Sequence, residues 1–191
     1  TATNLQADDN IENTPIYAFD LSVTNYEAEL TAFNFTTSGT ATNADINSLK
    51  AWYSTDATFN ITDTNLDNIT TTLGTGIHSF SGLSQTIANG NTGYIFITAS
   101  LPCNATNGNT IIVNAITTAD LTFTTGNKSG IAYPSGTHII TEVPPNNITN
   151  LTTVNCENNG VNLSWTDATG CYDNYLVVAS TTSENAPTGN S

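Results

Sequence analysis

Runs of β-branched and aromatic residues, each bounded by Gly, Asn or Pro, recur along this chain and are densest between Gly93 and Phe123. Within that stretch, the apolar segments 94–99, 111–116 and 121–123 are separated by polar turns. This pattern predicts strands joined by turns. We expect the segments 95–97 and 111–113 to be central strands, because they are uncharged and prone to pair if exposed at an edge.

Earlier segments show the alternation of a half-buried antiparallel strand. It is cleanest in 16–23, where the residues predicted to face inward are Tyr17, Phe19, Leu21 and Val23. In 29–37 the shared face is expected to carry Thr31, Phe33 and Phe35. Further strands are predicted at 49–54, 77–80 and 83–87, a single helical turn at 45–47, and a loop with a short edge strand at 56–72. Short strands with a turn about every eight to twelve residues indicate a β-sandwich.

The composition changes after residue 126, where Gly130, Pro134 and Gly136 interrupt the pattern of strands before the pair Pro144-Pro145. Such a stiff Pro pair after a punctuated segment is typical of a domain boundary. We therefore predict a lead-in over 1–9, a first sandwich over 10–126, a linker over 127–143 and a second unit over 144–191.

The second unit shows only three predicted strands, at 148–154, 161–165 and 175–179, with Val161, Leu163 and Trp165 expected to face inward. Three strands cannot bury both faces of a sheet and are marginal alone in water. Either the sequence is cut within a domain, or another chain supplies the missing strands by edge pairing. We favour the first, because the polar tail resembles an inter-strand loop; the second predicts a defined oligomer or filament.

Charge narrows the possible partners. The chain of 191 residues has two basic side chains, Lys50 and Lys128, against sixteen carboxylates, for a formal charge of −14. Phosphate backbones are bound by Lys and Arg, so nucleic acid is not expected as a partner. No apolar run reaches the roughly 18 residues of a membrane span. A surface of Thr, Asn and Ser with almost no Lys suits a secreted or cell-surface protein.

Three cysteines, Cys103, Cys156 and Cys171, leave at least one unpaired within the chain. A Cys156–Cys171 bridge would close a short loop and stabilise the fold by roughly 3 kcal/mol. The alternative is three buried thiols acting as small apolar side chains.

Candidate chemistry is sparse. His78 and His138 are far apart in sequence and have no Gly-x-Ser-x-Gly motif to accompany them, so we expect surface or hydrogen-bonded strand residues. The carboxylate pairs Asp8/Asp9 and Asp63/Asp67 lie in polar stretches without aromatic sugar platforms. A weak calcium candidate is the set Asp56, Asp63 and Asp67, which lacks an EF-hand spacing. No cofactor is expected otherwise.

Two stretches carry a family resemblance. Residues 161–166 and 170–180 (VNLSWT and GCYDNYLVVAS) resemble the first strands of a fibronectin type III domain, with Trp165 and Tyr175 at its core aromatic positions. Residues 49–54, 76–84, 93–99 and 121–123 resemble a β-sandwich repeat of large secreted, adhesin-like proteins of Bacteroidota. The resemblance implies an immunoglobulin-like sandwich followed by a partial fibronectin type III-like domain, export by the type IX system, and no catalytic residues.

We therefore expect an all-β, non-enzymatic structural or adhesive module of an extracellular multidomain protein, in contact with neighbouring domains or subunits. The alternative is an accessory carbohydrate-binding module of a secreted hydrolase. Glycan contact would fall to Trp52 and Tyr53, one of which must face outward by alternation.

Overall fold

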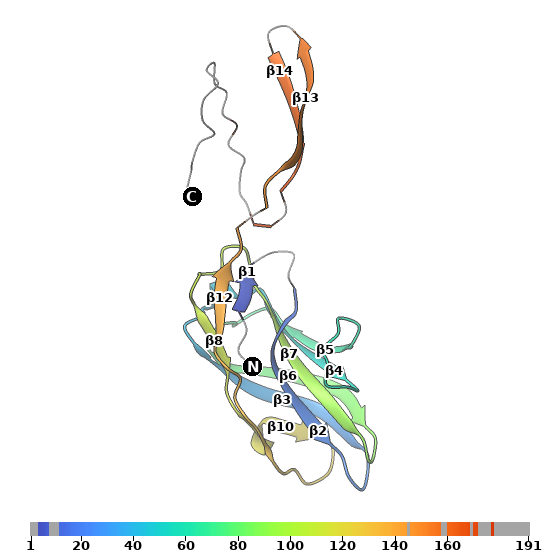
Figure 1. Ribbon diagram of the computed structural model, residues 1–191. Coiled ribbons are helices and arrows are strands. Elements are labelled where there is room, and N and C mark those ends of the chain that lie inside the picture. Colours follow the sequence, from blue (N-terminus) through green and yellow to red (C-terminus); the bar gives the residue numbers. More distant parts are fainter. Residues whose placement is uncertain are drawn as a thin grey trace. The chain divides into compact units, whose positions relative to one another are not determined.

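The computed structural model describes residues 4–7, 12–144, 146–157, 160–168, 170, 171 and 177 (Figure 1). The chain forms two compact units, which meet between Pro144 and Pro145. The described residues are all-β apart from two single-turn 3₁₀ helices, η1 (Asn43–Asp45) and η2 (Thr118–Asp120). Within these described ranges, no helix is long and apolar enough to cross a membrane.

One layer of the first unit is a six-stranded sheet organised around its longest strands. It contains β1 (Asn4–Ala7), β3 (Ala28–Gly39), β6 (Gly76–Ile87), β8 (Thr110–Val113), β10 (Leu121–Phe123) and β12 (His138–Glu142). Strand β3 pairs with β6 along one edge and with β10 and then β8 along the other. Beyond β8 lies β12, which is joined in parallel by β1.

The other layer is a four-stranded antiparallel sheet in the order β2, β7, β4, β5. Its strands are β2 (Thr14–Ser22), β7 (Thr92–Ser100), β4 (Ser48–Ser54) and β5 (Thr64–Ile69). A separate two-stranded ladder joins β9 (Ile116–Thr117) to β11 (Ile131–Ala132). The predicted loop with a short edge strand at 56–72 is confirmed as β5.

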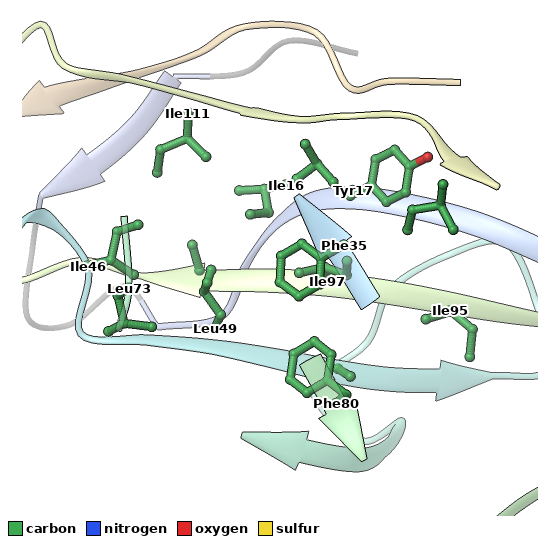
Figure 2. Close-up of a cluster of buried hydrophobic side chains, with 14 of the residues drawn as sticks. Ile16, Tyr17, Phe35, Ile46, Leu49, Leu73, Phe80, Ile95, Ile97 and Ile111 are labelled. Atoms are coloured by element: carbon green, nitrogen blue, oxygen red, sulfur yellow. The ribbon is translucent and has the colours of Figure 1, made fainter. Parts of the chain in front are cut away.

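Aromatic side chains from both sheets form one core (Figure 2). The rings of Phe19 in β2 and Phe33 in β3 meet edge to face across the layers, with 5.8 Å between their centroids. Phe80 in β6 stacks on Phe35 at 5.4 Å. Each such ring contributes about 1.5–3 kcal/mol by its removal from water. The predicted sandwich and the inward residues Tyr17 and Phe19 are therefore confirmed.

The most apolar segments lie inside the sheets, as predicted. Strand β7 is flanked by β2 and β4, and β8 is flanked by β3 and β12. The sheet edges carry features that oppose further pairing: β2 contains Pro15 and a register shift beside it, β5 is rich in Asn and Asp, and β6 is bent at Gly82. The Ser81 N–H beside that bend donates to Asp67 Oδ2 of β5 at 3.4 Å.

The expected lead-in and linker differ from the structure, because both contribute strands to the first unit. Leu5 and Ala7 of β1 and Ile140 of β12 are fully buried in the core. These strands are only four and five residues long, so each shows too little alternation to stand out beside Gly and Pro. The expected boundary at Pro144-Pro145 coincides with the division between the units.

The structure differs from four other local predictions. A register shift between Leu30 and Ala32 puts Leu30 in the core, while Thr31 is half-buried and donates to the Thr122 carbonyl. The segments 77–80 and 83–87 are one strand, β6, which Gly82 bends with a φ of 71°. The predicted strand 111–116 is broken at 114–115, and the helical turn occupies 43–45.

The described part of the second unit is a hairpin of β13 (Thr149–Glu157) and β14 (Gly160–Thr166). Leu163 is 40% exposed, so its predicted inward position is wrong, whereas Trp165 is half-buried. Among the described residues of this unit, no further strand forms a second layer over Leu163. The side chain of Val161 and the predicted strand 175–179, apart from Val177, lie outside the described residues.

Candidate functional site

A hollow of about 750 Å³ opens at one end of the first unit. One wall is the end of β2 and the turn into β3, residues 20–28; the other is β10 and the segment after it, to Ser129. Figure 1 shows the β2–β3 turn and β10 at the same end of the two layers. The hollow thus lies at the end of the sandwich where β2 of one sheet turns into β3 of the other.

Hydrogen bonds fix both walls. The Val23 N–H donates to the Asn91 carbonyl, and the Gly90 N–H donates back to the Val23 carbonyl, each at 2.9 Å. On the other wall, Thr124 N–H donates to the Glu29 carbonyl at 3.1 Å. Lys128 Nζ donates to the Leu121 carbonyl at 2.5 Å. The hollow is therefore built by the fold before any ligand arrives.

The lining combines one exposed ring with many neutral polar groups. Tyr26 is 83% exposed at its rim, although most aromatic side chains of the unit are buried. Hydroxyls, amides and two carboxylates also line the hollow, from Ser22, Thr24, Thr125, Ser129, Asn25, Asn127, Asp20 and Glu27. The apolar lining comes from Leu21, Leu121 and Phe123. Tyr26 lies in the turn between β2 and β3, and an aromatic residue in such a polar stretch was the signal available in the sequence.

The predicted glycan pair is not an open platform. Trp52 does project from the core-distant face of β4, but it is only 6% exposed. Its indole meets Phe59 edge to face at 5.4 Å, and its Nε1–H donates to Thr98 Oγ1 at 2.9 Å. Tyr53 points the other way and packs against the core, where its ring lies over Gly93. The loop that carries Phe59 thus closes the surface that the sequence offered for a sugar.

Both histidines are buried and hydrogen-bonded within the sheets. His78 Nε2 lies 2.8 Å from Thr37 Oγ1 and 3.2 Å from the Gly74 carbonyl. Because a carbonyl only accepts, Nε2 carries the proton. Burial lowers the pKa of His78, and the hydrogen bond to Gly74 opposes this shift only in part. His138 Nε2 similarly donates to the Ile16 carbonyl at 2.8 Å. Each histidine therefore ties neighbouring strands or turns together.

Each calcium candidate accepts a hydrogen bond from a backbone N–H close to it in sequence. Asp56 accepts the Thr58 N–H and Asp63 accepts the Asn60 N–H, each at 2.8 Å, while Asp67 accepts the Asn68 N–H at the same distance. Among the described residues, no group of three or more His, Cys, Asp or Glu side chains is placed to hold a metal ion. The pair Asp8/Asp9 lies outside the described residues.

A buried carboxylate that the sequence analysis missed organises another part of the unit. Asp45 is 1% exposed and accepts from Thr42 N–H, Thr106 N–H and Asn109 Nδ2 at 2.7, 2.7 and 3.0 Å. Burial alone would raise the pKa of Asp45, but the donors from Thr42 and Thr106 outweigh it and hold that pKa well below 3.8. The signal available was Thr42-x-x-Asp45, a capping box.

Cys103 and Cys171 are both disulfide-bonded. The side chain of Cys156 lies outside the described residues. The Cys156–Cys171 bridge therefore stays a prediction. Cys103, for which the sequence suggested no role, is therefore not a free thiol.

No protein-family model matches this chain, and no curated protein matches it. The resemblance to fibronectin type III domains and to Bacteroidota surface repeats therefore remains a prediction from the quoted residues.

Proposed function

We propose that this chain is a non-enzymatic structural or adhesive module of an extracellular or cell-surface multidomain protein. Its first unit would be an immunoglobulin-like sandwich, and its second the beginning of a fibronectin type III-like domain. The observation that carries the proposal is how the first unit uses its polar groups. Its buried histidines and Asp45 hold strands and turns in place, while hydroxyls, amides and two exposed tyrosines, Tyr26 and Tyr133, are presented outward.

The two packed sheets support the immunoglobulin-like assignment, since sandwiches of this kind bury the inward residues of both layers. The features at the sheet edges support a role as a discrete module, because they oppose uncontrolled strand addition. A filament built by regular contacts between subunits or neighbouring domains remains compatible with the same surface.

The location can be tested on intact source cells with an antibody against the first unit. We expect the antibody to label unpermeabilised cells or to detect the protein in the medium, and external protease to remove the cell-bound signal. Signal that appears only after permeabilisation would contradict the proposal. Particles coated with the chain then test adhesion, with particles coated with heat-unfolded chain as the matched control.

A second candidate function is an accessory carbohydrate-binding module of a secreted hydrolase. The observation that favours it is the exposed ring of Tyr26 beside a preformed polar hollow. The Trp52/Tyr53 pair no longer supports it, because Trp52 is covered and Tyr53 packs on the core. The two candidates differ in what the surface contacts: another protein or module in one case, and a soluble glycan in the other.

A further inference from the structure

We infer that the hollow between the β2–β3 turn and the segment after β10 binds a neutral oligosaccharide, with Tyr26 as its stacking platform. This inference rests on the carbohydrate-binding candidate proposed above and gives that candidate a site and a ligand class. It is independent of where in the source organism the chain is displayed.

The first support is the exposure of Tyr26. A ring that is 83% exposed leaves most of its apolar surface in water, at a free-energy cost that contact with a ligand removes. The face of an aromatic ring carries negative charge density, which attracts positively polarised C–H groups. One face of a pyranose presents such C–H groups together. Tyr26 is thus suited to pack against a sugar ring, and its hydroxyl remains free to face water or a sugar hydroxyl.

The second support is the polar lining. Sugar hydroxyls both donate and accept, so they pair best with groups that offer complementary acceptors and donors. The Asp20 and Glu27 carboxylates can accept from neighbouring hydroxyls, and the Asn25 and Asn127 amides can do both. The apolar part of the lining, Leu21, Leu121 and Phe123, matches the remaining C–H surface. A few placed polar groups around apolar surface are the usual composition of a small-ligand site.

The charges select a neutral ligand. Two carboxylates, Asp20 and Glu27, line the hollow against one ammonium, Lys128, which is already bonded to the Leu121 carbonyl. The whole chain carries a formal charge of −14. Phosphorylated, sulfated or uronic acid ligands would meet repulsion both locally and at long range. Neutral hexose or pentose chains would not.

The third support is preorganisation. The turn that carries Tyr26 is held to the 88–91 turn by the paired hydrogen bonds of Val23. The opposite wall is held by β10 on β3 and by Lys128 on Leu121. A site whose walls are already fixed loses little conformational entropy when its ligand binds. A weakly binding sugar can therefore use most of its contact energy for affinity.

The unit also contains a matched control for Tyr26. Tyr133 is 79% exposed, and it does not line the hollow. Its backbone carbonyl accepts the Tyr17 hydroxyl at 2.7 Å, a contact that a side-chain substitution leaves in place. Tyr133→Ala thus removes an equally exposed ring from elsewhere on the same unit.

Calorimetric titration of the full chain with cello-, xylo-, manno- and malto-oligosaccharides tests the inference. We expect at least one series to bind, Tyr26→Ala to weaken that binding by about tenfold or more, and Tyr26→Phe to retain most of it. Tyr133→Ala should bind like the parent chain. Thermal unfolding of Tyr26→Ala should match that of the parent, because the ring is exposed.

Each other result contradicts the inference in a recognisable way. If no series binds, the ligand class is wrong, while the adhesion and location experiments still decide the structural proposal. If an oligosaccharide binds but Tyr26→Ala binds equally well, the module binds carbohydrate elsewhere. Equal losses in Tyr26→Ala and Tyr133→Ala would indicate non-specific adsorption to exposed rings. Binding of a Lys-rich peptide that outcompetes every oligosaccharide would identify a cationic protein segment as the ligand.

Discussion

Asp45 Oδ1 accepts the backbone N–H of Thr106 at 2.7 Å across a sequence separation of 61 residues. This bond joins the turn before β4 to the turn between β7 and β8, and Asn109 Nδ2 adds a second link from that turn to Asp45 Oδ2. One buried carboxylate thereby holds together two connections, each of which runs from one sheet to the other.

The same capping box occurs twice in this unit, which gives a matched pair of variants. Thr117-x-x-Asp120 repeats the box of Thr42-x-x-Asp45, but Asp120 is half-buried and accepts from the N–H and the hydroxyl of its own cap residue, Thr117. We expect Asp45→Asn to lower the free energy of unfolding by about 2–4 kcal/mol, since it leaves buried donors without an acceptor. Asp120→Asn should cost about 0.5–1 kcal/mol.

Chemical denaturation of the parent and both variants measures these free energies. Equal losses in the two variants would show that only the local cap matters and that the long-range bonds of Asp45 contribute nothing.

Asp45 also predicts sensitivity to acid. Its pKa is lowered in the folded chain, so the folded state binds fewer protons than the unfolded state at mildly acidic pH. The stabilisation of the fold by the Asp45 carboxylate is fully present above about pH 4, near the pKa of an aspartate in the unfolded chain. It is lost as the pH falls toward the lower pKa that Asp45 has in the folded chain. Melting temperatures between pH 6 and pH 2 should fall more steeply for the parent than for Asp45→Asn. Parallel curves would contradict a depressed pKa.

His78 predicts a second, milder dependence with the same sign. Burial lowers the pKa of its imidazole, so the unfolded state takes up a proton before the folded state as pH falls below about 6.5. Stability should therefore decrease as pH falls through the window just below that value. His78→Gln should remove this decrease in stability, whereas Thr37→Val, which keeps the titrating ring, should retain it. Denaturation midpoints at closely spaced pH values between 7 and 5 provide the measurement.

Phe59 covers Trp52, and its removal should expose the indole. Centroid distances of 5.4 Å to Trp52 and 5.7 Å to Phe96 place the Phe59 ring over both. We expect Phe59→Ala to cost about 2 kcal/mol, below the 3–5 kcal/mol typical of a fully buried ring. In a Trp165→Phe background, acrylamide quenching should rise for Phe59→Ala and stay unchanged for Ile61→Ala, an exposed neighbour in the same loop. Equal quenching in all variants would mean that the Trp52 indole is already exposed to solvent when Phe59 is present.

Alternation along the chain predicted the sandwich, the aromatic core and the central position of β7 and β8, because side chains on a strand must choose between core and solvent. It failed where that period breaks. Register shifts near Thr31 and Gly82 change which residues face inward. Strands as short as β1 and β12 complete a few repeats only, and their pairing with each other and with β8 depends on contacts distant in sequence.

The candidate site was less predictable than the fold. Alternation predicted that one of Trp52 and Tyr53 faces outward without saying which, and the covering of Trp52 by Phe59 depends on how the 55–63 loop folds back. Tyr26 and Lys128 come together only because β10 pairs with β3, and no local pattern in either segment indicates that neighbour. Sequence alone therefore located the longer strands of the first unit and left open which surface is hollow.

The most specific proposal made for this chain is that the Tyr26 hollow binds a neutral oligosaccharide, and backbone-amide NMR of the full chain during oligosaccharide titration can locate that binding residue by residue. We predict that the largest changes in amide chemical shift occur in residues 20–28 and 121–129, with Tyr26 and Asn127 among them. The amide chemical shifts of residues 52–63 and of Tyr133 should not change. Shifts centred on Trp52 and Tyr53, or none at millimolar oligosaccharide, would contradict the claim.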